Sequence, residues 1–234
     1  MIKKITELPN LSVCCMSLAK IYAQFNAFSG SVLENNFYMQ TVGEKITALF
    51  SQDGGSVNLW CDNADYEEIK DFLAVLCPSV IFTELKNCKA LGITPERTRN
   101  SLFRTCSATE NMCQDFSLKE LYDALNLGSD VDIHLPSFEV FAPDVSHRLR
   151  HLAARAVLSE FGGALAFTYE GGAVMSGIAV SPDYRGKGKG KELLCKLLSL
   201  CDGGFFVAAN EENTKFYLRN GFELKDKVVF GRME

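Results

Sequence analysis

The sequence of 234 residues has little of several features that mark particular classes of protein. It lacks a run of about 18 uncharged apolar residues, which a membrane-spanning helix requires. Its nine cysteines include no Cys-x-x-Cys pair, so nothing suggests a metal cluster or a disulfide framework. A net charge of −5 argues against a general nucleic-acid-binding face. We therefore expect a soluble, cytoplasmic protein that binds neither nucleic acid nor membrane.

A glycine-rich segment stands out instead, Arg185-Gly186-Lys187-Gly188-Lys189-Gly190. It follows the strand-like pattern of residues 172–180 and precedes an amphipathic helical pattern that begins near Glu192. Glycines let the backbone approach an anion closely, and a helix N-terminus adds a partial positive charge. Because cations alternate with the glycines, the segment predicts a phosphate-binding turn, although a solvated basic turn would have the same composition.

Spacing excludes the two common nucleotide loops. The P-loop pattern needs a glycine five positions before Gly190, where Arg185 stands, and a hydroxyl residue where Glu192 stands. The dinucleotide pattern starting at Gly186 needs a glycine at position 191, which is lysine. A nucleotide-binding protein is therefore a weak alternative.

A second motif follows in residues 210–222, which contain Asn210, Tyr217 and the pair Gly221-Phe222. The pattern predicts a short helix over 213–219 that ends in a left-handed turn before a strand. Together the two motifs resemble the coenzyme A pyrophosphate loop, Arg/Gln-x-x-Gly-x-Gly/Ala, and the later segment of the GNAT acetyltransferase superfamily.

This resemblance implies an α/β fold with a central mixed β-sheet flanked by helices. It also implies an N-acetyltransferase in which a primary amine attacks acetyl-CoA directly in a ternary complex, without a metal. Tyr217 would protonate the leaving thiolate, unless it is only a core aromatic. A non-catalytic acyl-CoA-binding sensor is the alternative. The implied cofactor contacts are Ile178, Ala179, Val180, Arg185, Gly186, Lys187, Gly188, Lys189, Gly190, Asn210, Asn213 and Phe216, with Asn210 and Asn213 competing for one role.

The two halves of the chain share a pattern. A predicted hairpin, a strand, an Asp-Tyr pair and a helix occur around Asp65-Tyr66 and again around Asp183-Tyr184. We therefore expect a tandem of GNAT-like units, a degenerate domain over 1–108 and a catalytic domain over 109–234, although chance similarity is the alternative. Glu67-Glu68 replaces the glycine loop in the first half and would repel phosphate. The polar residues 94–101 are expected to form a surface connection.

Residues 144–151 place His147 and His151 four residues apart, on one face of a predicted helix with Asp144 or Ser146 as N-cap. A metal site would need a third ligand that the pattern does not offer. The segment is either a solvated basic face or part of an acceptor pocket for a small-molecule or peptide amine, in which the acceptor contacts are His147, Arg148, Arg150 and His151. Candidate bases are Glu170, His147, His151 or a water relay, and the chain could be a monomer or a homodimer.

Overall fold

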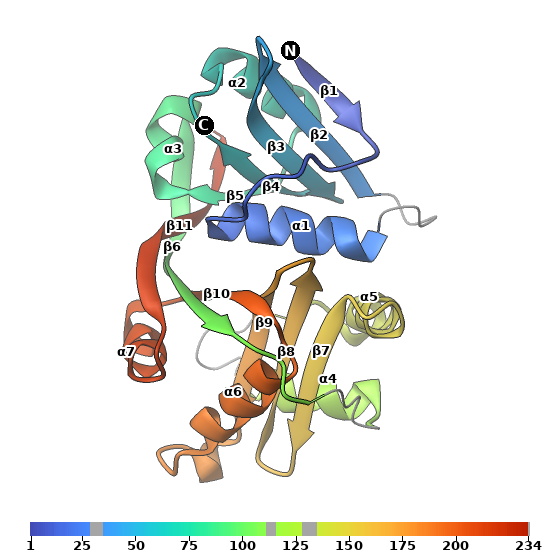
Figure 1. The fold of residues 1–234 in the computed structure, drawn as a ribbon, viewed down its shortest axis with the longest axis vertical. Coiled ribbons are helices and arrows are strands. Elements are labelled where there is room, and N and C mark those ends of the chain that lie inside the picture. Colours follow the sequence, from blue (N-terminus) through green and yellow to red (C-terminus); the bar gives the residue numbers. More distant parts are fainter. Residues whose placement is uncertain (29–34, 111–115, 128–134, 234) are drawn as a thin grey trace. The chain divides into compact units, whose positions relative to one another are not determined.

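The computed structural model describes residues 1–28, 35–110, 116–127 and 135–233, and these fall into two compact units (Figure 1). Unit 1 comprises Met1–Leu102 and Val207–Glu234, and unit 2 comprises Phe103–Phe206. Strands β6 (Ile93–Cys106) and β10 (Gly203–Ala209) each run from one unit into the other. The strands of both units belong to one mixed sheet of eleven strands, and each unit has its own apolar core.

Unit 1 is built on a mixed sheet in the order β1-β2-β3-β4-β5-β11-β6. Its further elements are α1 (Met16–Phe28), α2 (Tyr66–Leu76), α3 (Leu85–Leu91), α7 (Glu211–Arg219), β1 (Ile2–Ile5), β2 (Asn35–Val42), β3 (Lys45–Asp53), β4 (Ser56–Cys61), β5 (Val80–Glu84) and β11 (Glu223–Met233). Strands β1 to β4 pair antiparallel in sequence, β4 and β5 pair in parallel, and β5 pairs antiparallel with β11.

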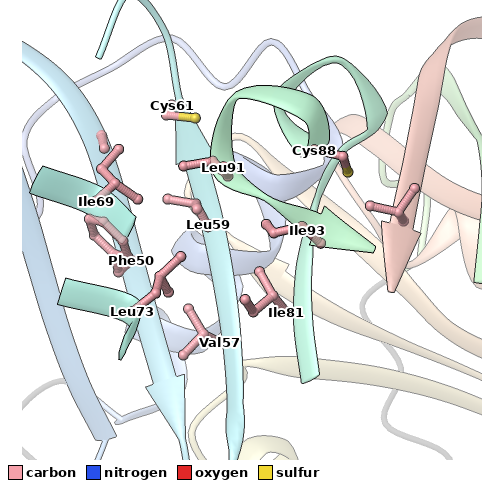
Figure 2. Close-up of a cluster of buried hydrophobic side chains, with 12 residues drawn as sticks. Phe50, Val57, Leu59, Cys61, Ile69, Leu73, Ile81, Cys88, Leu91 and Ile93 are labelled. Carbon is pink, nitrogen blue, oxygen red and sulfur yellow. The ribbon is translucent and has the colours of Figure 1, made fainter. Parts of the chain in front are cut away.

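Helices cover both faces of this sheet, because alternate strand residues point to opposite sides. On one face, Phe50 packs with Ile69 of α2 and Leu91 of α3 in a cluster of fully buried apolar side chains (Figure 2). On the other face, the neighbouring residue Leu49 packs with Ile21 of α1. The period-2 pattern of β3 therefore fixes which helices lie on which side.

Unit 2 has the sheet order β6-β10-β9-β8-β7. Its further elements are α4 (Leu118–Asn126), α5 (Phe138–Arg150), β7 (Ala154–Ser159), β8 (Gly162–Tyr169), β9 (Gly172–Val180), the 3₁₀ turn η1 (Pro182–Tyr184) and α6 (Lys189–Ser199). Helix α4 begins with the predicted capping box of Ser117 and Glu120. Leu121 of α4, Phe141 of α5 and Leu165 of β8 share one buried cluster.

The predicted tandem arrangement is confirmed, because the same elements occur twice in the same order. A helix, three antiparallel strands, a helix, a parallel strand, a helix and a last strand make up α1-β2-β3-β4-α2-β5-α3-β6 and then α5-β7-β8-β9-α6-β10-α7-β11. The last strands are exchanged: β11 of the second repeat pairs with β5 of the first, and β6 of the first repeat adjoins β10 of the second. The domain boundary near residue 108 stays a prediction.

Two local predictions are wrong. Residues 94–101 belong to β6 and not to a loop, because backbone pairing rather than side-chain burial holds this exposed strand. The backbone of β11 lies so close that a Cβ on Gly231 would be 2.5 Å from the carbonyl oxygen of Thr94. Helix α5 has Ser137 as its N-cap, not Asp144 or Ser146, because Phe141 and Val145 extend its buried side towards the N-terminus.

The N-terminal ends of β9 and β10 are joined through glycines. The amide N–H of Gly204 donates to the carbonyl oxygen of Gly171 at 2.9 Å. A Cβ on Gly203 would lie 2.1 Å from that same oxygen, and a Cβ on Gly172 would lie 2.2 Å from the carbonyl oxygen of Gly204. Only glycine permits this approach of the two backbones.

We expect Gly203→Ala to lower the free energy of unfolding by more than about 3 kcal/mol, because it adds a backbone clash to the strain of a φ of +86°. Gly171→Ala is the matched control: Gly171 also has a positive φ, +83°, but open space around the Cβ position, so only about 1–2 kcal/mol is expected. Urea denaturation of both variants measures the difference. Equal losses would show that the close approach is not the constraint.

Candidate active site

Strands β9 and β10 pair at their N-terminal ends. In the pairing that the structure describes, they match in parallel at Gly172↔Gly204, Ala173↔Phe205 and Val174↔Phe206. From there β9 runs on to Val180 with β8 on its other edge, and a shift in register makes Ser176 a bulge. Every second residue of an antiparallel strand points its backbone groups away from its partner. The edge of β9 over residues 175–180 can therefore pair with amide groups of a ligand.

The predicted cofactor contacts on β9 are close to the end of this edge. Ala179 is buried, and Ile178 and Val180 are partly exposed. All three pair with the start of β8. Their backbone groups, rather than their side chains, are the part that a ligand could reach.

The glycine segment forms a tight turn between β9 and α6. Gly186 and Gly188 both have left-handed backbone angles, with φ of +73° and +78°, and no atom lies within 4 Å of either Cβ position. Gly188 is the N-cap of α6, which starts earlier than predicted, so Lys189 and Gly190 lie in its first turn. The first N–H groups of a helix have no partner within the helix. The turn therefore presents such groups with no side chain above them, which suits an anion.

Arg185 holds this turn in place through two hydrogen bonds to backbone carbonyl oxygens. Its Nε donates to the carbonyl oxygen of Val180 at 3.1 Å, and its Nη2 donates to that of Leu127 at 3.0 Å. Leu127 is the C-cap of α4, where carbonyl oxygens favour a nearby cation. Arg185 thus positions the turn between β9 and α4, a role that its place in the motif did not reveal.

The lysines of the turn differ in their partners. Lys189 forms an ion pair of 2.9 Å with Glu192, and its Nζ lies 4.4 Å from the ring centroid of Phe161. The hydrogen bond from Lys189 lowers the pKa of Glu192. Lys187 is exposed and, within the described part of the chain, forms no ion pair; its Nζ lies 5.8 Å from the Tyr184 ring centroid. Lys187 is therefore the side chain of the turn best able to meet a phosphate.

The predicted residues of the second motif lie on α7, in unit 1. Asn210 is the N-cap of α7, and its side-chain oxygen accepts from the N–H of Asn213 at 2.7 Å. Tyr217 is only 6% exposed, with its ring centroid 5.1 Å from Phe216 and 5.4 Å from Phe222. The structure thus groups β9 with the glycine turn in unit 2, whereas contact between these α7 residues and a cofactor stays a prediction.

Glu170 lies in the turn between β8 and β9 and is exposed. This turn precedes β9, whereas the glycine turn follows it, so the two lie at opposite ends of the strand. A catalytic base must come within hydrogen-bond reach of the amine, so the role of Glu170 as the base stays a prediction.

The four predicted acceptor contacts lie at the C-terminal end of α5 but differ in burial. The rings of His147 and His151 have centroids 4.4 Å apart, and His151 and Arg150 are exposed. The Arg148 side chain is 3% exposed; its Nε is 2.9 Å from an Asp144 oxygen, and its guanidinium carbon is 4.1 Å from the Phe167 ring centroid. These contacts indicate that Arg148 stabilises unit 2, which sequence spacing did not reveal.

In the first repeat, the start of α2 occupies the position that the glycine turn has in the second. Acidic side chains and their hydrogen-bond partners surround this helix start. Asp65 caps α2 by accepting from the N–H of Glu68 at 3.1 Å. Glu68 accepts from the N–H of Ile2 and from the amide of Gln40, both at 2.8 Å. Burial raises the pKa of Glu68, but these hydrogen bonds and the Met1 ammonium hold it below its usual range. The charged carboxylate would repel a phosphate at this helix start.

The described residues offer neither a metal centre nor a membrane-spanning helix. No group of three potential His, Cys, Asp or Glu ligands is placed to hold a metal ion in that part of the chain. Among the same residues, no helix is long and apolar enough to cross a membrane.

Comparison with protein families connects the two motifs. Residues 150–224 match the family model described as an acetyltransferase (GNAT) domain. This chain contains a GNAT acetyltransferase domain. The matched segment includes both the glycine turn of unit 2 and α7 of unit 1. A single sequence domain therefore contributes residues to both compact units. No curated protein matches the sequence.

Solved structures support the fold of the whole chain. A GCN5-related N-acetyltransferase from Kribbella flavida is similar with a TM-score of 0.61 at 13% identity, over 94% of this chain and 96% of that one. One from Sphaerobacter thermophilus has a TM-score of 0.54 at 14% identity, over 86% and 81% of the two chains. At such identities the likeness establishes the GNAT fold and not a shared substrate.

We expect Arg148→Ala to lower the free energy of unfolding by about 1–3 kcal/mol, because it removes both an ion pair and a cation–π contact. Arg150→Ala, two residues further along α5 and exposed, should change the free energy of unfolding by less than about 0.5 kcal/mol. Thermal denaturation of the two variants is the measurement. A stable Arg148→Ala protein would contradict the structural role and favour contact with the substrate.

Proposed function

We propose that this GNAT domain transfers an acetyl group from acetyl-CoA to a primary amine. The observation that carries the proposal is the open edge of β9, which leads directly into a turn of two left-handed glycines at the start of α6. An edge of this kind can pair with the amides of a pantetheine arm, and the turn can accept the pyrophosphate. The Arg-x-x-Gly-x-Gly residues that the GNAT resemblance requires are all present, from Arg185 to Gly190.

In the proposed reaction the neutral amine attacks the thioester carbonyl carbon. A nitrogen–carbon bond forms, the carbon–sulfur bond breaks, and the nitrogen loses a proton. Backbone N–H groups near Ile178–Val180 would stabilise the negative charge on the carbonyl oxygen. Tyr217 would donate a proton to the coenzyme A thiolate. Coenzyme A and the N-acetylated amine are the products.

The acceptor amine must lose its proton before it attacks. Glu170, His147, His151 or a water relay would accept that proton, and the exposed Arg150 would meet an acidic group of the acceptor. We do not assign Arg148 to acceptor binding, because its guanidinium already contacts Asp144 and Phe167 within unit 2. The acceptor is a small-molecule or peptide amine.

A free-thiol release assay with acetyl-CoA and a panel of amines tests the activity. Release that depends on one class of amine supports a transferase. If coenzyme A binds at micromolar concentration but no amine produces thiol, the chain is instead a sensor that binds acyl-CoA without turnover. If calorimetry detects no binding of coenzyme A, both functions are wrong.

We expect Gly188→Ala to raise the Kd for coenzyme A about five- to thirtyfold. A left-handed alanine costs about 1–2 kcal/mol, and relief of that strain would move the N–H groups of the turn. Gly54→Ala is the matched control: Gly54 also has a positive φ, +53°, with open space around it, but lies in the turn between β3 and β4. Calorimetric titration should find its affinity unchanged, and equal losses in both variants would argue against a local effect.

We expect Tyr217→Phe to lower kcat by about 10²-fold or more with little change in KM for acetyl-CoA, because only the proton of the hydroxyl is removed. Steady-state thiol release and thermal denaturation measure catalysis and stability separately. An undiminished kcat in a folded variant would remove Tyr217 from the mechanism and leave it as a core aromatic.

A further inference from the structure

Tyr169 links strands of unit 2 that are not neighbours in the sheet. It is the last residue of β8 and pairs with Gly172, the first residue of β9. Its hydroxyl donates to the carbonyl oxygen of Gly204 on β10 at 3.2 Å. Tyr169 is buried, with 6% of its surface exposed. Its side chain therefore joins β8 to β10, although β9 lies between them.

The absence of a side chain on Gly172 makes this path possible. A Cβ on Gly172 would lie 2.4 Å from the hydroxyl oxygen of Tyr169 and 2.5 Å from its Cζ, closer than packed atoms approach. The ring of Tyr169 thus fills the space that a side chain on Gly172 would need. An aromatic residue that covers a glycine on the paired strand helps to hold the register of a sheet.

A second ring covers the other glycine of the pair. A Cβ on Gly204 would lie 2.9 Å from Cε2 of Phe103, a residue of β6, and 3.7 Å from the hydroxyl oxygen of Tyr169. Phe103 also packs against Phe206 of β10, with ring centroids 4.9 Å apart. The two rings therefore approach the paired glycines from the strands on either side, β8 and β6.

The position of β9 matters for the candidate site because the predicted cofactor contacts lie on the same strand. Gly172 begins β9, and Ile178, Ala179 and Val180 end it just before the glycine turn. The carbonyl oxygen of Gly204 would lose a hydrogen bond without the Tyr169 hydroxyl, and the start of β9 would be held less firmly against β10. A displacement of about 1 Å at a site can cost a large factor in binding or rate.

We propose that Tyr169 is a positioning residue of the acyl-CoA site, an inference that rests on the proposed function. It acts through the backbones of Gly172 and Gly204 and not by contact with the cofactor. Its ring and hydroxyl hold the start of β9 against β10, and this preorganises the β9 edge and the glycine turn for coenzyme A.

The test compares Tyr169→Phe with Tyr122→Phe in the full chain. Tyr122 is the matched control, because its hydroxyl also donates to a backbone carbonyl oxygen in unit 2, that of Pro136 at 3.1 Å, but from α4. Each change removes one hydrogen bond and should lower the Tm by no more than about 4 °C. Calorimetric titration with coenzyme A should give a Kd about three- to tenfold higher for Tyr169→Phe and unchanged for Tyr122→Phe.

Backbone hydrogen exchange gives a readout that needs no coenzyme A. In Tyr169→Phe, peptides that contain residues 171–174 and 203–206 should exchange faster than in the unmodified chain, because the hydrogen bond between the two strand starts opens more often. Peptides of α4 should exchange at an unchanged rate. Unchanged exchange at the strand starts would show that the hydroxyl does not hold them together, and this would overturn the proposal.

The two measurements separate the possible failures. Faster exchange with an unchanged Kd would leave Tyr169 a purely structural residue and would contradict the positioning role alone. An equal rise of Kd in both variants would also contradict it, because the effect would not be local to β9 and β10. If the unmodified chain binds no coenzyme A, the proposed function is wrong and the positioning role falls with it.

Discussion

The close approach of Gly171-Gly172 to Gly203-Gly204 is the contact on which the candidate site depends. Side chains would force the starts of β9 and β10 apart, and the hydrogen bond from Gly204 to Gly171 would be lost. The strands are held together at one end, and within the described residues their pairing ends at Val174, so the backbone of β9 beyond it has no further pairing with β10 there. The glycine turn and the start of α6 follow this edge directly, so a flexible arm and an anionic group can be bound in sequence along one element.

The exchange of last strands explains why compact units and sequence repeats differ. Strand β11 belongs to the second repeat by its order in the sequence, yet it pairs with β5 of the first. Strands pair through backbone hydrogen bonds, so a strand from either repeat can pair at a sheet edge if its side chains fit both faces. The match of the family model to residues 150–224, across both units, is what such an exchange produces. The first repeat keeps the fold, while carboxylates at the start of α2 replace the glycine turn.

Some features could be read from the sequence because they depend on near neighbours. Strand β9 was predictable from its apolar run and the capping box of α4 from two residues three positions apart. The polar strand β6 could not be read in this way, because its stability comes from the backbone of a partner far along the chain. The burial of Arg148 depends on Phe167 of β8, which spacing on α5 cannot show. The doublets Gly171-Gly172 and Gly203-Gly204 were visible but became meaningful only when paired.

The sequence by itself indicated the GNAT domain and predicted a phosphate-binding turn, since such a turn is a local arrangement of glycines and cations at a helix start. It also determined that one repeat carries this turn and the other does not. Only the tertiary structure decided which cations of the turn already have protein partners, which arginine of α5 is buried, and that Lys20 lies against the ring of Phe82. Those outcomes depend on side chains that meet from distant strands and helices, and burial, unlike spacing, is set by everything that packs around a group.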